Sequence, residues 1–267
     1  MTRLLPRSFG REAFGLDPAN YHVARPAYPD VVWSALRERA GLRAGIDILE
    51  IGAGTGLATE PLLLMQPRRL VAVEPDSRLA AFLGERLADP RLEIEMSTFE
   101  EADLGPSSFD LVASATSFHW LDAPRALRLI RDRLRPDGFL ALWWNVFGDP
   151  RRADAFHDAT AHLFAGQSTS PSGTGITKLP YGIDTKARLD DLRRAQFRPD
   201  EPQVLDWTLT LDPPAVRRLY ATYSNVTYLP IVERERLLDE LETVARELFG
   251  GVVTRNMTTA LYIARRG

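Results

Sequence analysis

The stretch ILEIGAGTGLATE, residues 48–60, decides how this chain can be interpreted. An apolar run ends in Gly52, Gly54 and Gly56, and a helix-like segment follows. Glycine has no Cβ, so backbone N–H groups in such a bend can approach a ligand closely. Glu50 places a carboxylate just ahead of the bend. The pattern predicts a ligand-binding turn between a strand and a helix, although a plain strand-to-helix turn would also use glycine.

The first 145 residues alternate between short apolar runs and amphipathic segments, which is typical of parallel strands joined by helices. We therefore expect an α/β fold: a doubly wound, mostly parallel, seven-stranded sheet of the Rossmann-like type with helical lid insertions. Pro61 should delay or shorten the second helix, and Asp76 should cap the third. The expected strands cover 46–52, 69–75, 91–97, 109–116 and 139–145, and the expected helices 29–41, 56–65, 76–88 and 123–138.

The second half departs from this alternation. A helix over 150–164 precedes residues 165–182, which are rich in Gly, Ser, Thr and Pro. A segment of this length is either a surface loop or a mobile lid over a site. A strand over 203–211, helices over 213–223 and 231–249, and a closing strand over 258–266 complete the expected elements.

Composition excludes several classes of function. The chain has 267 residues, and 33 basic against 36 acidic side chains give a net charge of −3. No basic stripe favours nucleic acid, and no apolar run approaches the roughly 20 residues that cross a bilayer. The chain contains no cysteine and begins without a secretory pattern. We expect a cytoplasmic enzyme, a monomer or homodimer, with a small-molecule substrate, no nucleic-acid partner and no membrane association.

Glu74 ends the second expected strand in VAVEPD, residues 71–76. In a nucleoside-binding doubly wound fold, a carboxylate at this place accepts both ribose hydroxyls. A ribose alone does not distinguish a nicotinamide dinucleotide from S-adenosylmethionine. The glycine spacing does, because the dinucleotide fingerprint requires a third glycine where Leu57 stands.

The run Glu50-x-Gly52-x-Gly54-x-Gly56 resembles motif I of the class I S-adenosylmethionine-dependent methyltransferases. Four further segments are similar to that family, and the Phe-His-Trp run within them is similar to its small-molecule type 11 subgroup, which includes trans-aconitate- and ubiquinone-methyltransferase-like enzymes. These segments are YHVARPAYPD (21–30), STFEEADL (97–104), SFDLVASATSFHWLD (108–122) and LRPDGFLAL (134–142).

The resemblance implies S-adenosyl-L-methionine as cofactor, leaving as S-adenosyl-L-homocysteine. It also implies N-terminal cap helices over 1–45, a cofactor-binding core over 46–149, a helix and lid loop over 150–200, and a C-terminal part of the sheet with inserted substrate-side helices over 201–267. The cofactor-binding residues it implies are Tyr21, Arg25, Glu50, Gly52, Ala53, Gly54, Gly56, Glu74, Pro75, Thr98, Phe99, Thr116 and His119.

His119 is also the candidate general base, because imidazole titrates near neutral pH; a cofactor contact is the alternative. Trp143 and Trp144 are neighbours in one strand and must point to opposite faces, so only one can line a pocket. Arg217 and Arg218 could bind an acidic acceptor, although a solvated helix face explains them as well. The expected substrate-side residues are Trp120, Trp144, Asn145, Tyr220 and Tyr223.

No metal is implied, since His157 and His162 lie on different faces of their helix. The expected function is methyl transfer from S-adenosylmethionine to an O, N or C atom of a small molecule by in-line displacement. The alternatives are a binding protein for S-adenosylmethionine or a nucleoside that has lost turnover, and a nicotinamide-dependent oxidoreductase.

Overall fold

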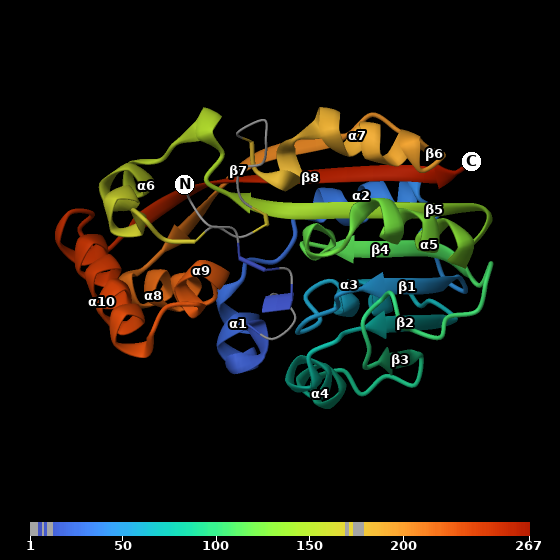
Figure 1. The fold of residues 1–267 in the computed structure, drawn as a ribbon, viewed down its shortest axis with the longest axis horizontal. Helices are drawn as coiled ribbons and strands as arrows, with labels where there is room; N and C mark the ends of the chain where they lie inside the picture. The colour runs from blue at the N-terminus through green and yellow to red at the C-terminus, as the bar shows by residue number, and fades with distance from the viewer. Residues whose placement is uncertain (1–4, 7, 10–12, 169–170, 173–178) are drawn as a thin grey trace.

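The computed structural model describes residues 5–6, 8–9, 13–168, 171–172 and 179–267. Its centre is a sheet in which five parallel strands lie in the order β3-β2-β1-β4-β5 (Figure 1). The reversal of strand order beside β1 confirms the doubly wound expectation. The strands are β1 (Asp47–Ile51), β2 (Arg69–Val73), β3 (Leu92–Glu95), β4 (Phe109–Ala115) and β5 (Leu134–Phe147).

Three antiparallel strands complete the sheet. β8 (Val253–Arg266) pairs with β5, and both β6 (Phe197–Pro199) and β7 (Gln203–Leu211) pair with β8. β6 and β7 follow one another along the same edge of β8, because Pro199 opposes Ala264 and Gln203 opposes Leu261. The sheet therefore has eight strands in the seven positions that the sequence predicted. The short β6 was not expected, because three residues carry no periodic signal.

Helices cover both faces of the sheet. α2 (Asp30–Arg39), α3 (Thr59–Leu64) and α4 (Ser77–Arg86) pack on the face that contains Ile48 and Trp143. α5 (Ala123–Arg133) and α7 (Thr185–Arg194) pack on the face that contains Leu49 and Trp144. Trp143 and Trp144 thus point to opposite sides, as their adjacent positions in β5 require.

Local chemistry explains where the elements begin and end. Asp76 caps α4 by accepting from the Arg78 N–H, and α3 starts late at Thr59 with Pro61 in its first turn, both as expected. α5 ends at Arg133, earlier than expected, since β5 starts at Leu134 and continues through the Pro-Asp-Gly sequence.

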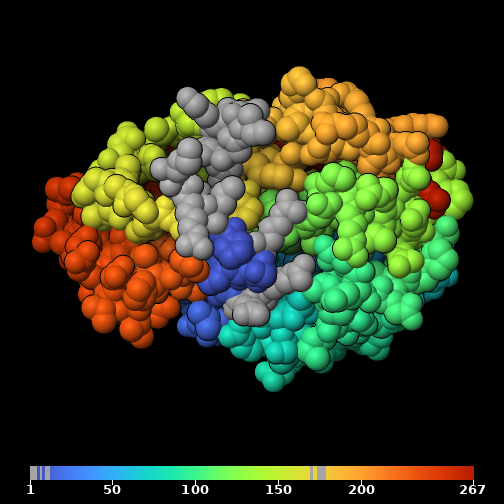
Figure 2. Space-filling view, in the orientation of Figure 1, coloured from blue at the N-terminus to red at the C-terminus, as the bar shows by residue number. Residues whose placement is uncertain are grey.

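A smaller helical lobe lies beyond one end of the sheet (Figure 1). Its own core forms around Phe156, Leu219 and Leu241. In Figure 2 the N-terminal segment lies between this lobe and the sheet. The lobe helices are α6 (Ala155–Thr160), α8 (Pro213–Ala221), α9 (Ser224–Thr227) and α10 (Ile231–Glu247), and the N-terminal segment contains η2 (Phe14–Leu16) and α1 (Pro18–Ala24).

Short 3-10 turns complete the chain: η3 (Phe118–Trp120), η4 (Pro150–Arg152), η5 (Ala161–Phe164) and η6 (Tyr181–Ile183). α6 is shorter than the expected helix over 150–164 because η4 occupies the start of that range and η5 occupies its last turn, whereas β8 begins earlier than expected. Within the expected lid loop 165–182, residues 169–170 and 173–178 lie outside the described residues.

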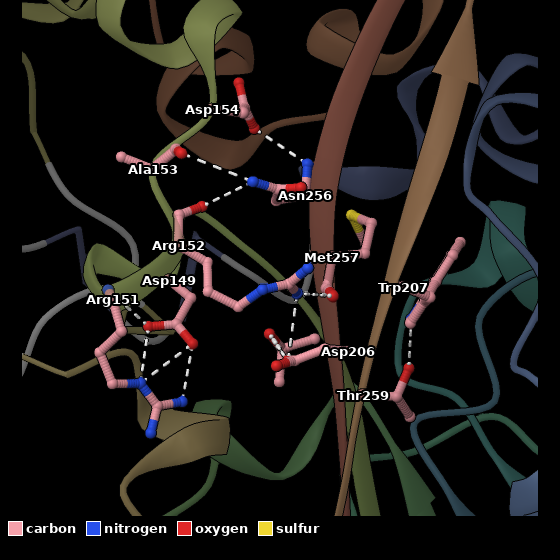
Figure 3. Close-up of polar contacts among 11 residues, drawn as sticks. Asp149, Arg151, Arg152, Ala153, Asp154, Asp206, Trp207, Asn256, Met257 and Thr259 are labelled. Atoms are coloured by element: carbon pink, nitrogen blue, oxygen red, sulfur yellow. Dashed lines mark hydrogen bonds and ion pairs between the residues drawn. The ribbon is translucent and has the colours of Figure 1, made fainter.

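A polar clamp joins the lobe to the long strand β8 (Figure 3). The Asp154 carboxylate accepts from Arg255 Nε at 2.9 Å and from the Asn256 backbone N–H at 3.0 Å. Arg152 donates to the Met257 carbonyl and pairs with Asp206 at 3.1 Å. Asp154 and Arg255 are both buried, so the clamp fixes the start of α6 against the sheet.

None of the helices in the described part of the chain has both the length and the apolar character that a membrane span requires.

Candidate active site

A pocket opens beyond the carboxyl ends of β1, β2, β3 and β4, where ligands of open parallel sheets bind. The turn after β1, the end of β2 and the segments after β3 and β4 form its walls. η2 and α1 close it from the N-terminal side, and Ser224 closes it from the lobe. Among the expected cofactor residues, those that line it are Tyr21, Arg25, Glu50, Gly52, Ala53, Gly54, Glu74, Pro75, Thr98, Phe99, Thr116 and His119.

The three glycines of the turn have different functions. All have positive φ, with Gly52 at 72°, Gly54 at 59° and Gly56 at 87°. A Cβ on Gly52 would lie 2.5 Å from the Ser117 Cβ, whereas one on Gly54 would meet no atom of the described residues within 4 Å. A Cβ on Gly56 would lie 2.6 Å from a Leu83 methyl. Gly56 therefore lets the turn pack against α4, and it is not among the residues that line the pocket.

Glu74 is held at the end of β2 by two backbone donors. One carboxylate oxygen accepts from the Gly54 N–H at 2.7 Å, and the other accepts from the Asp76 N–H at 3.0 Å. Each oxygen retains a second lone pair. Burial raises the pKa of Glu74 to about 7. The side chain thus presents two acceptor sites to the pocket from a fixed position.

Glu50 is the most unusual group in the pocket. Its side chain is buried, neither carboxylate oxygen makes a hydrogen bond of good geometry within the described residues, and the neighbouring Thr59 hydroxyl offsets only part of the effect of burial on its pKa. Burial raises the pKa of Glu50 to about 8. A buried carboxylate without partners is costly, so its surroundings favour a ligand that brings both positive charge and hydrogen-bond donors.

The N-terminal segment is tied to the pocket from two sides. Arg25 donates from Nη2 to the Thr222 carbonyl at 2.8 Å and lies over the rings of Tyr21 and Tyr223. The Tyr28 hydroxyl donates to the Thr116 Oγ1 at 3.0 Å. Thr116 has a φ of 54°, which is a strained backbone conformation for a β-branched residue. Such strain is concentrated at functional sites.

His119 is buried at the end of β4, and the Trp144 indole donates from Nε1 to the His119 Nδ1 at 3.1 Å. Burial lowers the pKa of His119 to about 3, assisted by the positive charge of Arg25. A neutral imidazole with so low a pKa is a poor general base near pH 7. The arrangement supports the alternative that His119 contacts the bound ligand.

Four expected substrate-side residues do not line the pocket, and Trp120 is the one that does. Trp144 is core and supports His119. Asn145 donates to the Pro26 and Ala27 carbonyls and accepts from Thr259, so its amide is used to anchor the N-terminal segment. A polar residue at a strand end can serve either purpose, and the sequence pattern does not distinguish them.

Tyr220 and Tyr223 belong to the interior of the lobe. The Tyr220 hydroxyl accepts from Arg255, and the Tyr223 ring packs against Phe147 and Arg25. Arg217 pairs with Glu235 and Asp239 on the surface, as the solvated-face interpretation expected. The structure thus places the two tyrosines inside the lobe and away from the pocket, because helical spacing does not show which face meets the sheet.

The structure adds wall residues that the sequence did not single out. Tyr28 stands in the YHVARPAYPD segment and could have been found there, as could Ser117 beside the Phe-His-Trp run. Phe14, Ser172 and Ser224 come from segments without a recognisable motif, and only the tertiary fold brings them to the pocket. The described residues contain no group of side chains arranged to hold a metal ion.

Comparison with known proteins agrees with this geometry. A protein-family profile described as a methyltransferase domain matches residues 49–142. An uncharacterized methyltransferase of Schizosaccharomyces pombe is 26% identical over 95% of this chain and 96% of its own length. An uncharacterized methyltransferase of Mycobacterium tuberculosis is 35% identical, over 50% of this chain and 52% of that protein.

Among solved structures, a protein from Anaeromyxobacter dehalogenans named as a type II methyltransferase has a TM-score of 0.64 at 23% identity, covering 90% of this chain and 97% of that one. This likeness concerns the fold. The glycine turn, the two carboxylates behind it and the relatives in sequence together support a class I S-adenosylmethionine-dependent methyltransferase.

Proposed function

We propose that this pocket binds S-adenosylmethionine and that the chain transfers its methyl group to an O, N or C atom of a small molecule. The observation that carries the proposal is the pair of buried carboxylates on adjacent strands. Glu50 makes no hydrogen bond of good geometry among the described residues, and Glu74 is fixed by the Gly54 N–H. Glu50 therefore favours a cationic group that carries hydrogen-bond donors. Glu74 presents hydrogen-bond acceptors for the two hydroxyls of a diol.

The residues of the pocket fit the parts of this cofactor. Glu74 would accept from the two ribose hydroxyls with its remaining lone pairs. Glu50 would accept from the ammonium group, directly or through water, and so gain the partner that its burial demands. Thr98 and Phe99 follow β3 and would flank the adenine. Gly54 leaves the space above the turn free of a side chain.

When bound, S-adenosylmethionine would supply an electrophilic methyl group on a sulfonium, which is transferred by in-line displacement. The tasks of the protein are then alignment and exclusion of water. Phe14 and Tyr21 cover the pocket, and Trp120 and Leu121 add apolar wall. Because residues from several elements enclose the pocket, we expect the methyl acceptor to be a small molecule.

Calorimetry with S-adenosylhomocysteine, S-adenosylmethionine and NAD tests the cofactor directly. We expect binding of the first two and none of NAD; tight binding of NAD alone would support the oxidoreductase. A Glu50→Gln variant should bind S-adenosylmethionine more weakly, because the charge opposite the ammonium group is lost.

Transfer is tested separately from binding. Incubation with methyl-labelled S-adenosylmethionine and a fractionated metabolite extract should label a small organic product. Cofactor binding without any labelled product across all fractions would favour a binding protein that has lost turnover.

A further inference from the structure

The contact between Trp144 and His119 determines which imidazole nitrogen carries the proton. An indole N–H can only donate, so the Nδ1 that it meets at 3.1 Å must be the unprotonated nitrogen. A neutral ring must then carry its hydrogen on Nε2. The tautomer therefore follows from heavy-atom geometry.

The charges around the ring keep it neutral. Arg25 and Arg188 are the charged groups that act on His119, and both are cations. The Arg188 guanidinium lies 3.4 Å from the centroid of the Tyr181 ring, which itself packs beside His119. Since neither charge is a carboxylate, no charged group among the described residues stabilises an imidazolium.

Trp144 itself is rigidly held. Its ring packs against Tyr181 and Tyr262, with centroids 5.6 and 6.0 Å away. A Cβ on Gly182 would lie 2.7 Å from the Trp144 Cβ, so the backbone of η6 closes directly over the base of the tryptophan side chain. The indole donor is therefore fixed by both its strand and its neighbours.

We propose that Trp144 is a positioning residue that holds His119 as a fixed N–H donor at the pocket wall, and that the group docked against Nε2 is an oxygen acceptor, a carboxylate or carbonyl of the bound molecule. The inference rests on the proposed function of this pocket. Arg25 lines the same pocket and adds positive charge that favours such an oxygen. His119 then orients a ligand and removes no proton.

Nitrogen-15 NMR of the histidine side chains tests the tautomer of His119 and needs no methyl-acceptor substrate. In the wild type, His119 should show a protonated Nε2 and a bare Nδ1, unchanged between pH 8 and about pH 5. Trp144→Phe removes the donor and keeps an aromatic ring, and it should give mixed tautomers. Trp143→Phe makes the same change of size on the opposite face of β5, where the indole N–H has no partner among the described residues, and should leave the spectrum unchanged.

A protonated Nδ1 in the wild type, or a Trp144→Phe spectrum identical to the wild type, would overturn the proposal. Calorimetry with S-adenosylhomocysteine on the same samples keeps the two hypotheses apart. If the wild type does not bind this ligand, the proposed function fails whatever the tautomer is.

A second variant locates the oxygen. His119→Phe should lower the affinity for the molecule that supplies this oxygen by about tenfold, which is the effect of one lost hydrogen bond. A loss with S-adenosylhomocysteine but not with 5′-methylthioadenosine, which lacks the amino-acid end, identifies the cofactor carboxylate. A raised KM with unchanged kcat for the labelled acceptor places the oxygen on the acceptor. Unchanged affinity for both nucleosides together with unchanged KM would refute the donor role.

Discussion

The backbone N–H of Gly54 donates a 2.7 Å hydrogen bond to the carboxylate of Glu74. This bond joins the turn after β1 to the end of β2, so each feature positions the other. Because the Asp76 N–H occupies the second oxygen of Glu74, the carboxylate cannot rotate without losing a donor. The pocket is therefore organised before a ligand arrives, which lowers the entropic cost of binding.

Replacing Glu74 with Gln should lower the affinity for S-adenosylmethionine by about 10- to 100-fold, because a hydrogen bond to a charged acceptor contributes about 1.5–3 kcal/mol. The amide also has only one acceptor oxygen for two backbone donors. Calorimetry measures the loss. Glu93→Gln, on β3 and exposed, is the matched control and should bind as the wild type does. Equal affinity of both variants would remove Glu74 from the site.

A side chain at Gly54 should block the ligand more than it harms the fold. Its φ is 59°, and Gly250 has the same φ of 59°; a Cβ at either position would meet no atom within 4 Å in the described part of the chain. Alanine should therefore cost both sites a similar free energy of unfolding, about 1–2 kcal/mol for the left-handed backbone. Only Gly54→Ala should lose cofactor affinity. If Gly250→Ala lost it equally, the turn would have no special place in binding.

The stability of the ligand-free protein should fall as pH rises from about 4.5 to about 8. Burial raises the pKa of Glu50 to about 8 and of Glu74 to about 7, from the ordinary value of 4.5 for a glutamate side chain. The folded state then holds protons that the unfolded state releases, so stability decreases with pH. Urea unfolding across this range measures the slope, and Glu50→Gln should flatten its upper part. A flat wild-type profile would contradict the two raised values.

Binding should have the opposite pH dependence. A cationic ligand favours the ionised carboxylates, so S-adenosylmethionine should bind more tightly at pH 8 than at pH 6 and should release protons on binding at pH 7. Calorimetry in two buffers of different ionisation enthalpy counts these protons. An enthalpy that is the same in both buffers would show that neither carboxylate titrates with the ligand.

The titration of His119 should not contribute to the pH dependence of methyl transfer. Burial lowers the pKa of His119 to about 3, so the ring is neutral throughout the range from pH 5 to 9. We expect kcat to keep the same pH profile in His119→Asn as in the wild type, with the labelled acceptor as substrate. A limb near pH 6.5 that disappears in the variant would restore the general-base hypothesis.

Removing Arg255 should destabilise the fold strongly. Its guanidinium and the Asp154 carboxylate are both buried, and truncating one partner leaves the other charge unpaired. Arg255→Met should lower the free energy of unfolding by about 3–5 kcal/mol. Arg246→Met removes an exposed pair with Glu242 on α10 and should cost less than about 1 kcal/mol. Similar values for the two variants would mean that the buried pair of Arg255 and Asp154 is not needed for stability.

Local sequence predicted the parts of the site that depend on strand ends. Glu50, Gly54 and Glu74 could be placed because parallel strands end at one edge, and the chemistry of each residue matches its position. The same logic failed for Trp144 and Asn145, which also stand near a strand end. A strand end can meet a ligand or another segment of the chain, and periodicity does not say which.

The sequence by itself determined the doubly wound sheet, the glycine bend and the two carboxylates, because these follow from alternation, backbone freedom and charge within a few residues. Only the tertiary structure decided that Gly56 packs on α4, that Trp144 holds His119, and that Phe14, Ser172 and Ser224 reach the pocket. Those relationships join segments far apart in the chain. They depend on how helices and the lobe pack against the sheet, which no local pattern encodes.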